Sequence, residues 1–370
     1  MSDRRLARAP VGVMHLTDTL DIGGAEHMAV NLVNRLPRDR FRPYLCTTRR
    51  SGPLADLVAS DVGQISLDRR YRFDERAVRN LVHFIRAHDV SILHAHGTAV
   101  FTAAVAALLP PYPLVIWHIH FGRHASVRNP GWMYRLIARR VDHTITVNEA
   151  LASWASARLG IPAARVSYIP NFASCANGKE AGIALPGTPG ERIVCVANFL
   201  PEKDHATLLR AMQQVVRERP AAHLLLVGAG GHTGNERGVR KIIDALGISD
   251  NVTMLGQRRD VPTILAQADI GVLSSTAEGL PLALIEYGRS GLPTVVTRVG
   301  QCADVVDGGR AGMLVTPGRD DELAAALLEL LGSADRRAVL AAGLRERTTR
   351  MFDPGTVMGQ ISAVYDEVMA

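Results

Sequence analysis

The chain lacks the sequence features of a membrane-spanning, secreted or zinc-stabilised protein. No apolar run reaches the roughly 18–20 residues needed to span a bilayer, and the longest, Ala99 to Leu109, stops at two prolines. The basic N-terminus is not followed by the continuous apolar segment of a signal peptide. The 4 cysteines are scattered and form no Cys-x-x-Cys pair, which favours free thiols in a reducing compartment. We therefore expect a cytoplasmic protein.

Two motifs that hold phosphorylated ligands in many enzymes are also missing. Asp-x-Asp occurs nowhere, so no such carboxylate pair is available to hold a metal ion on a diphosphate. Gly-x-Gly-x-x-Gly is absent as well, because the first turn has only Gly23-Gly24 and Gly228-Ala-Gly230 lacks the third glycine. We therefore expect no metal and no other cofactor, and a nicotinamide-dependent dehydrogenase is disfavoured.

What the chain does contain is typical of a folded protein with two domains. Of its 370 residues, 47% are hydrophobic and 21% charged, and this length exceeds what one hydrophobic core usually supports. Lys and Arg total 42 against 36 Asp and Glu, and the net charge of +6 favours anionic partners. No helix-turn-helix, zinc finger or RNA-binding aromatic motif is present. We therefore expect no nucleic acid partner, and a non-catalytic basic binding protein is the alternative ranked last.

Strand and helix patterns alternate along both halves of the chain. In the first half, the expected strands are Val11–Leu16, Arg42–Thr47, Val90–His94, Leu114–His118, His143–Val147 and Val166–Ile169. In the second half, they are Ile193–Val196, His223–Val227, Val252–Leu255, Ile270–Leu273 and Thr294–Thr297. Helical patterns lie between them, which predicts an α/β fold of two doubly wound parallel sheets.

A stretch rich in Gly, Pro, Ala and Ser interrupts this alternation and divides the chain. We interpret residues 173–191 as a linker between a first domain of residues 1–172 and a second of residues 192–350. A C-terminal helix within residues 351–370 is expected to pack back on the first domain. Ligands of doubly wound sheets bind at the carboxyl ends of the strands, which predicts a site in the cleft between the domains.

The most informative stretch runs from Glu278 to Glu286, after the expected strand Ile270–Leu273. Pro281 suits the first position of a helix, so the backbone N–H groups of Gly279 and its successors are expected to face an anion. The two carboxylates flank this pocket and suit hydrogen bonds from paired hydroxyls of a sugar or ribose. Without such a ligand, one carboxylate is a helix cap and the other is solvated, and the residues alone leave both interpretations open.

Three other positions suit an anion at the same strand ends. Lys203 lies in the loop after the strand Ile193–Val196, where its ammonium group would meet a diphosphate, although most loop lysines are simply exposed. Gly228 begins a glycine-rich turn that permits close backbone approach to a ligand. In the first domain, Gly23 and Gly24 precede a helix and predict an anion-accepting turn.

Together these motifs resemble the retaining glycosyltransferases of the glycogen-synthase-like family four, which have the GT-B fold of two Rossmann-like domains. The resemblance extends over nearly the whole chain. It rests on the Gly23-Gly24-Ala25-Glu26 turn, the Pro201-Glu202-Lys203-Asp204 loop, the turn at Gly228, the segment Leu255–Val261 and the Glu278–Glu286 motif followed by Gly291-Leu292-Pro293. It implies a metal-independent hexosyltransferase (EC 2.4) of bacterial polysaccharide or lipid-linked sugar assembly.

The resemblance also implies roles for residues of the second domain, which binds the nucleotide-sugar donor in similar proteins. Glu286 would bind the ribose hydroxyls, and Glu278 would bind hydroxyls of the donor sugar. Gly279 and Leu280 would offer backbone N–H groups to the diphosphate. Lys203 would neutralise the leaving phosphate.

One position departs from the family pattern. Asn198 stands where the family usually has an arginine, within the segment Ala197-Asn198-Phe199. An asparagine donates a hydrogen bond to phosphate but supplies no charge, so stabilisation of the leaving group would depend more on Lys203 and on Arg258. Losing one such donor costs about 3 kcal/mol in transition-state stabilisation.

Two His-x-His pairs end strands of the first domain. His94 with His96, and His118 with His120, each share a face of a strand, but no third ligand follows at a metal-like spacing. We therefore disfavour a metal site. By the resemblance, a histidine after the strand that starts at Leu114 contacts the donor sugar; we favour His118, with His120 as the alternative if the strand register differs by one.

The resemblance places the acceptor in the first domain and implies a UDP- or GDP-linked sugar donor with a lipid-linked or glycan acceptor. The segments Arg69–Phe73 and Arg128–Arg140 mix cations with aromatics, as interfacial membrane surfaces and ordinary solvated helices both do. The sequence thus leaves open an anionic membrane surface as a further partner, with a peripheral location on the inner face of the membrane. A sugar-nucleotide epimerase or hydrolase on the same fold is the alternative function.

Overall fold

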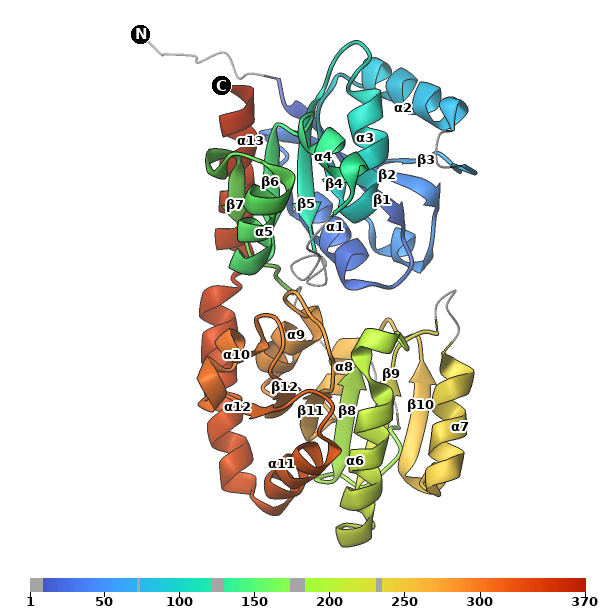
Figure 1. Cartoon of the computed structure of the whole chain (residues 1–370), viewed down its shortest axis with the longest axis vertical. Coiled ribbons are helices and arrows are strands. Elements are labelled where there is room, and N and C mark those ends of the chain that lie inside the picture. Colours follow the sequence, from blue (N-terminus) through green and yellow to red (C-terminus); the bar gives the residue numbers. More distant parts are fainter. Residues whose placement is uncertain (1–8, 72–73, 121–129, 174–183, 231–234) are drawn as a thin grey trace. The chain divides into compact units, whose positions relative to one another are not determined.

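The computed structural model describes residues 9–71, 74–120, 130–173, 184–230 and 235–370. It divides the chain into two compact units, each built around its own sheet (Figure 1). The first unit comprises Met1–Asn171 together with Pro354–Ala370, and the second comprises Phe172–Asp353. The last helix, α13 (Pro354–Met369), therefore belongs to the first unit although it follows the second in sequence.

The first unit contains a seven-stranded sheet in which every described pair of strands is parallel. In spatial order, the strands are β3 (Gly63–Ser66), β2 (Phe41–Arg50), β1 (Val11–Thr19), β4 (Val90–His96), β5 (Leu114–Ile119), β6 (His143–Thr146) and β7 (Val166–Tyr168). Besides α13, its helices are α1 (Gly24–Arg35), α2 (Glu75–Ala87), α3 (Val100–Ala106), α4 (Trp132–Ala138) and α5 (Glu149–Leu159). The chain order reverses direction between β1 and β4, which is the switch point of a doubly wound sheet.

The second unit repeats this design with a six-stranded parallel sheet. Its strands, in spatial order, are β10 (Val252–Gly256), β9 (His223–Val227), β8 (Arg192–Val196), β11 (Ile270–Leu273), β12 (Thr294–Thr297) and β13 (Met313–Val315). Its helices are α6 (His205–Glu218), α7 (Glu236–Leu246), α8 (Val261–Leu265), α9 (Leu282–Ser290), α10 (Cys302–Val305), α11 (Asp320–Gly332) and α12 (Ala334–Met351). The switch point here lies between β8 and β11.

Polar residues at the helix starts explain several of these boundaries. The side chain of Asp74 accepts a hydrogen bond from the backbone N–H of Ala77 at the start of α2, and Asn148 does the same for Leu151 in α5. At the other end of α5, Gly160 has a left-handed conformation with φ of 73°, which a glycine adopts without steric cost.

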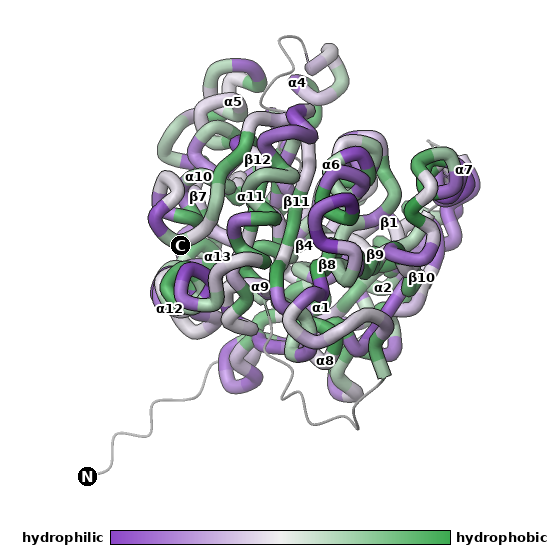
Figure 2. The backbone as a smooth tube through the Cα atoms, turned by 90° about the horizontal axis from the view of Figure 1, so that it is seen from below, coloured by the Kyte–Doolittle hydropathy of each residue, from purple (hydrophilic) through white to green (hydrophobic). Residues whose placement is uncertain are grey.

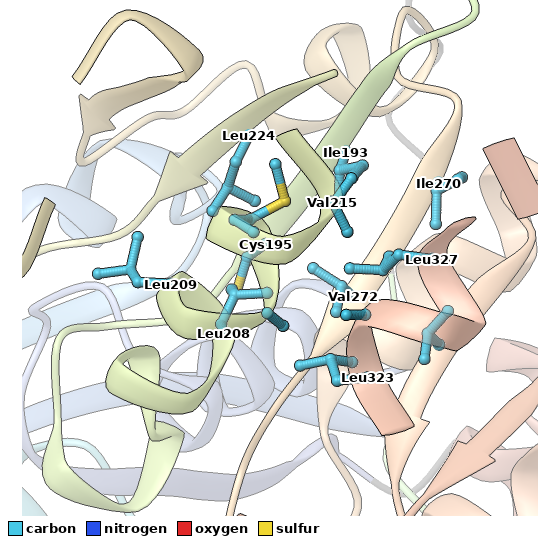
Figure 3. Close-up of a cluster of buried hydrophobic side chains, with 14 of the residues drawn as sticks. Ile193, Cys195, Leu208, Leu209, Val215, Leu224, Ile270, Val272, Leu323 and Leu327 are labelled. Carbon is cyan, nitrogen blue, oxygen red and sulfur yellow. The ribbon is translucent and has the colours of Figure 1, made fainter. Parts of the chain in front are cut away.

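The core of the second unit forms between its sheet and two helices. Side chains from β8, β9 and β11 pack against those of α6 and α11, as the labelled residues in Figure 3 show: Ile193, Cys195, Leu208, Leu209, Val215, Leu224, Ile270, Val272, Leu323 and Leu327. In Figure 2, α6 alternates between hydrophobic and hydrophilic residues, whereas β11 is predominantly hydrophobic. Each fully buried aliphatic side chain contributes about 1.5–3 kcal/mol, so this core holds the strand ends firmly in place.

Most expected elements match the structure, and the exceptions are short or irregular segments. The predicted strands His223–Val227, Ile270–Leu273 and Thr294–Thr297 have the bounds of β9, β11 and β12. The edge strands β3 and β13 were not predicted, because 3 or 4 residues show too little periodicity. Between β2 and β3 the chain forms only a short 3₁₀ helix, Pro53–Leu57. Among the described helices, none is both long and apolar enough to cross a bilayer.

Candidate functional site

The switch point of the second sheet places Lys203 and Glu278 together. Lys203 ends a 3₁₀ helix, Pro201–Lys203, that follows β8, and Glu278 lies in the loop after β11. Because β8 and β11 are parallel neighbours, their carboxyl ends meet at one edge of the sheet. Two loops separated by 75 residues in sequence therefore meet at this edge.

The two side chains form an ion pair that is largely shielded from solvent. Lys203 Nζ lies 2.6 Å from Glu278 Oε1, and the side chains are 21% and 7% exposed. The hydroxyl group of Ser275 donates a second hydrogen bond of 2.6 Å to the same oxygen. Charge-assisted bonds in a partly desolvated site are strong, so both side chains are held in defined positions.

Backbone contacts join the two loops beneath this pair. The hydroxyl group of Ser274 donates to the carbonyl oxygens of Lys203 (2.9 Å) and Asp204 (3.1 Å). The backbone N–H of Thr276 donates to the carbonyl oxygen of Glu202 at 2.8 Å. The loop after β11 is therefore attached to the loop after β8 by main-chain and side-chain hydrogen bonds.

The helix that follows Glu278 starts one residue later than the sequence predicts. Helix α9 begins at Leu282, and Pro281 is its N-cap residue with extended φ and ψ of −70° and 124°. The expectation of Pro281 at the first helical position was wrong, because its ψ angle is not helical. Gly279 and Leu280 accordingly lie in the loop before the cap; Leu280 is buried, and the carbonyl oxygen of Gly279 accepts a hydrogen bond of 3.0 Å from the Gln301 N–H.

A close backbone approach fixes the loop from its other side. Gly300 has φ of 51°, and a Cβ atom there would lie 2.4 Å from the carbonyl oxygen of Glu278. Only glycine satisfies both conditions without strain. Sequence patterns do not single out Gly300, since its role depends on a contact between two separate loops.

Glu286 lies one turn into α9 and is partly buried. Burial raises the pKa of its carboxyl group from 4.5 to about 7. Among the residues that the structure describes, no ion pair or hydrogen bond is found for this side chain. A buried carboxyl group without a cation beside it suits hydroxyl donors, which bind a carboxylate without adding charge.

Asn198 and Gly228 meet where β8 and β9 end. The Asn198 Oδ1 atom accepts a hydrogen bond of 3.0 Å from the backbone N–H of Ala229. A Cβ atom on Gly228 would lie 2.1 Å from the carbonyl oxygen of Ala197, so the glycine permits the two segments to touch. Asn198 therefore holds the glycine-rich turn in place.

The structure pairs Arg258 with a carboxylate close in sequence. Its Nε atom lies 2.7 Å from Asp260 Oδ1, and a second contact makes the pair bidentate. This pairing raises the pKa of the Arg258 guanidinium and lowers that of the Asp260 carboxyl. Asp260 thus compensates the charge of Arg258, as Glu278 does that of Lys203.

In the first unit, the glycine turn at the start of α1 lies against an acidic side chain. Gly23 is the N-cap residue, and Gly24 is the exposed first residue of the helix. A Cβ atom on Gly23 would lie 2.3 Å from Glu26 Oε2. Burial, followed by the nearby Asp21 and Asp18, raises the pKa of Glu26 to about 7.

Sequence reasoning missed a cluster of five buried histidines in the first unit. The adjacent strands β1, β4 and β5 contribute His15, His94, His96 and His118, and His120 directly follows β5. Strand register explains the proximity, since His15 pairs with His94 and His96 pairs with His118. The pattern is visible only when the order of the strands is known, because His15 lies 79 positions before His94 in the sequence.

Contacts at hydrogen-bond distance connect these rings one after another, and one tyrosine of α13 lies between two of them. The contacts are His118 Nδ1 to His94 Nε2 (3.1 Å), His94 Nδ1 to Tyr365 OH (2.6 Å), Tyr365 OH to His15 Nε2 (3.2 Å), His15 Nδ1 to His96 Nε2 (3.0 Å) and His96 Nδ1 to His120 Nε2 (2.8 Å). We call these six side chains the histidine chain. Its two ends, His118 and His120, stack with ring centroids 4.1 Å apart.

The histidine chain also contains two groups of three nitrogens, each within 4.8 Å, that bear on metal binding. The rings of His94 and His96 are inclined by only 2°, and those of His96 and His120 by 15°. Nitrogen lone pairs lie in the ring plane, so near-parallel rings do not direct them at one ion about 2.0–2.1 Å away. The described geometry therefore fits hydrogen bonds better than metal coordination.

Two family models match the chain and together span both units. Residues 22–176 match a model described as Glycosyltransferase Family 4, and residues 190–333 match one described as Glycosyl transferases group 1. Two parallel Rossmann-like sheets combined with these matches define a glycosyltransferase of the GT-B type. The chain belongs to glycosyltransferase family 4.

Known proteins similar to the chain include two mycobacterial mannosyltransferases. The MMP alpha-(1->4)-mannosyltransferase of Mycolicibacterium hassiacum is 30% identical over 64% of this chain and 57% of its own length. The GDP-mannose-dependent alpha-(1-6)-phosphatidylinositol monomannoside mannosyltransferase of Mycobacterium tuberculosis is 25% identical over 63% of this chain and 66% of its own length. A third relative is the exopolysaccharide phosphotransferase SCO2592 of Streptomyces coelicolor, of which the match covers 31%. The chain therefore spans between 31% and 66% of the length of these three relatives.

A solved structure with the same fold is that of Anabaena Alr3699/HepE in complex with UDP and glucose. It superposes with a TM-score of 0.80, covers 96% of this chain and 100% of its own chain, and is 19% identical in sequence. This similarity confirms the predicted GT-B fold.

Proposed function

We propose that the protein is a retaining glycosyltransferase that moves a sugar from a UDP- or GDP-linked donor to a hydroxyl group of a lipid-linked or glycan acceptor. The observation that carries this proposal is the shielded pair of Lys203 and Glu278 at the switch point of the second sheet. A cation and a carboxylate at adjacent strand ends suit the two halves of a nucleotide sugar, its diphosphate and its hydroxyl groups.

The difficult step is departure of the diphosphate, because negative charge grows on it as the sugar carbon becomes cationic. Lys203 is the cation that stabilises this negative charge, with the backbone N–H groups near Gly279 and Leu280 as further donors. Asn198 adds no charge, and Arg258 makes two bonds to Asp260. Lys203 makes one bond to Glu278, and its ammonium group has two further N–H donors for phosphate oxygens. Lys203 therefore has the main electrostatic role in this proposal.

The two glutamates bind hydroxyl groups on either side of the diphosphate. Glu278 accepts its bonds from Lys203 and Ser275 on one oxygen, Oε1, which suits donation from sugar hydroxyls to the other oxygen. Glu286 binds the ribose hydroxyls in its ionised form, and the pKa near 7 makes this binding stronger above neutral pH.

Retention follows from the side on which the acceptor attacks. A double displacement would need a carboxylate nucleophile at the sugar carbon, whereas Glu278 and Glu286 are proposed to bind hydroxyl groups. We propose instead that the acceptor hydroxyl attacks from the side that the diphosphate leaves. A diphosphate oxygen then takes the hydroxyl proton, the bond between the sugar carbon and the diphosphate breaks, and the new glycosidic bond forms.

The acceptor is proposed to bind the first unit near an anionic membrane surface. On α4, Trp132 and Leu136 share a face and are 73% and 53% exposed, and Arg135 and Arg139 are exposed beside them. Exposed apolar residues next to arginines suit the interface of an acidic membrane. Residues 72–73 and 128–129 of the two predicted segments lie outside the described residues.

A nucleoside-diphosphate release assay tests the proposal. UDP-linked and GDP-linked sugars are supplied with lipid-linked and glycan acceptors, with and without a chelator. We expect acceptor-dependent release that survives the chelator and disappears in Glu278→Gln but not in the exposed control Glu329→Gln. Release of free sugar or an epimer without acceptor would instead indicate a hydrolase or epimerase, and chelator sensitivity would contradict metal independence.

A further inference from the structure

We propose that the histidine chain acts as one unit in which all five histidines are neutral, share the Nε2–H tautomer, and thereby fix His118 Nε2 as a hydrogen-bond donor. In this arrangement Tyr365 is a positioning residue, because its hydroxyl group connects the two halves of the chain. The ligand of His118, an oxygen of the donor sugar, rests on the proposed function. The tautomers themselves do not depend on it.

The histidine chain is expected to be uncharged because its side chains are buried. All five histidines lie in β1, β4 and β5 or directly after β5, and burial lowers the pKa of each, to about 3 for His15 and His120 and well below the usual range for the other three. The partners described for the histidine chain are histidine, tyrosine and asparagine side chains, none of which is a carboxylate. A positive charge inside it would thus have no counter-ion.

Neutrality couples the tautomers. A neutral imidazole donates from one nitrogen and accepts at the other, and a tyrosine hydroxyl has one proton to donate. Five consecutive contacts then need five protons that all point the same way along the chain. Only two arrangements satisfy every contact: in one, all five histidines carry their proton on Nε2, and in the other, all five carry it on Nδ1.

The distances at Tyr365 select between the two arrangements. Its oxygen lies 2.6 Å from His94 Nδ1 and 3.2 Å from His15 Nε2. Bonds donated by a hydroxyl group are shorter than those donated by a nitrogen, so the short contact is the one that Tyr365 donates and the long one is the one it accepts. His15 therefore carries its proton on Nε2, and His94 accepts on Nδ1 and donates from Nε2 to His118.

The surroundings of His120 and His118, the two ends of the histidine chain, are compatible with the Nε2–H tautomers. At one end, the side chain of Asn171 interacts with His120, and a carboxamide can present either its oxygen or its NH₂ group. The Nδ1 atom of His120 is buried without a hydrogen-bond partner among the described residues, and at the other end His118 Nε2 is buried without one as well. A buried N–H group without an acceptor is unfavourable, so this end calls for a ligand oxygen.

A chemical consequence follows for His118. In the Nε2–H form its free nitrogen is already the acceptor for His94, so it has no lone pair to take a proton from a substrate. His118 then serves as a neutral donor to a sugar oxygen and not as a general base. This agrees with the proposed removal of the acceptor proton by the diphosphate.

The test is long-range ¹H–¹⁵N correlation NMR of the full chain labelled with ¹⁵N-histidine, recorded without substrate. Nitrogens with and without a proton differ widely in shift, so each assigned ring reports its tautomer. We expect all five histidines in the Nε2–H form. Mixed tautomers or a cationic ring would overturn the coupling, a bound metal ion would do the same, and five Nδ1–H forms would overturn the donor assignment of His118.

The variant Tyr365→Phe tests the connecting role of the hydroxyl group. The gap would then lie between His94 and His15, and a buried lone pair facing it costs less than a buried N–H. We expect His15, His96 and His120 to change together to Nδ1–H while His94 and His118 keep Nε2–H. The control Tyr44→Phe, a buried tyrosine of the same unit, should leave all five unchanged. Unchanged tautomers in Tyr365→Phe would contradict the proposal, and if this variant does not fold, the wild-type spectrum alone decides.

Because the measurement uses the unliganded protein, it separates the two hypotheses. Uniform tautomers in a protein without transferase activity would overturn the proposed function and leave the histidine chain intact. Mixed tautomers in an active transferase would overturn only the proposed coupling within the histidine chain.

Discussion

Lys203 and Glu278 are 75 residues apart in the sequence, yet Lys203 Nζ lies 2.6 Å from Glu278 Oε1. The pair stands at the carboxyl ends of β8 and β11, the two strands at which the sheet order reverses. A lysine in this position is aligned before any ligand arrives, so binding a diphosphate requires little reordering of its flexible side chain.

Removing the cation is expected to abolish transfer. In Lys203→Ala, we expect turnover to fall by about 10²–10³-fold, because one donor to a developing anion contributes roughly this much. The measurement is diphosphate release under saturating donor. Lys241→Ala, which removes an exposed lysine of α7, is the matched control and should retain full activity.

Measurements of stability distinguish a catalytic role of Lys203 from a purely structural one. Lys203→Ala leaves the Glu278 carboxylate shielded with only Ser275 as a partner, which we expect to cost on the order of 3 kcal/mol. The double variant Lys203→Met with Glu278→Gln removes both charges and should recover most of that loss in thermal unfolding, yet remain inactive. An active double variant would mean that the pair is structural only.

The sequence predicted the second unit well, since its signals are local. Strands such as Ile270–Leu273 are short apolar runs between turn residues, and the Glu278–Glu286 motif lies within one loop and helix. What it could not predict are contacts across strands. That Lys203 pairs with Glu278, and that His15 lies beside His94, follows from strand order and register.

The missed histidine chain illustrates this limit most clearly. Two His-x-His pairs were visible and were interpreted separately, and no third ligand was found at a local spacing. The structure supplies the missing neighbours from β1 and from Tyr365 on the last helix. His94 and Tyr365 are 271 residues apart in the sequence, so periodicity and motif spacing do not predict their contact.

Asn198 offers a test of electrostatics that keeps the geometry. Asn198→Asp retains the oxygen that accepts from the Ala229 N–H but adds a negative charge where the leaving phosphate is proposed to lie. We expect thermal stability to change little and turnover to fall at least about 10-fold. If Asn198→Asp remained as active as the wild type, the diphosphate would have to bind elsewhere.

Gly228 tests whether the close approach of two loops matters. In Gly228→Ala, the new Cβ atom would lie 2.1 Å from the carbonyl oxygen of Ala197, so the backbone must shift. We expect a loss of about 1–3 kcal/mol in the free energy of unfolding and weaker donor binding. The control Gly332→Ala, where a Cβ atom meets nothing within 4 Å, should not destabilise the protein.

The exposed apolar face of α4 predicts binding to anionic vesicles. Replacing both Trp132 and Leu136 by alanine removes the large exposed apolar groups, and we expect sedimentation with phosphatidylglycerol vesicles to decrease at least about 10-fold. Val339→Ala, an exposed apolar residue of α12, is the control. Equal sedimentation of all three proteins would exclude α4 as the membrane contact.

Glu286 predicts a pH dependence with a definite sign. Its folded pKa of about 7 exceeds the ordinary 4.5, so between these values the unfolded chain has released a proton that the folded protein still holds. Stability therefore falls as the pH rises through this window, by at most about 3 kcal/mol, and stays constant above it.

In Glu286→Gln this contribution is absent. Relative to wild type, the variant should gain up to about 3 kcal/mol in the free energy of unfolding between pH 4.5 and 8, measured by denaturant titration at several pH values. Donor binding should show the opposite sign. Only the ionised carboxylate makes charge-assisted bonds with ribose hydroxyls, so the wild-type KM for the donor should decrease as the pH rises through 7, whereas the variant should bind about 10-fold more weakly at pH 8 with no such dependence. A flat KM profile in the wild-type enzyme would show that Glu286 does not contact the nucleotide.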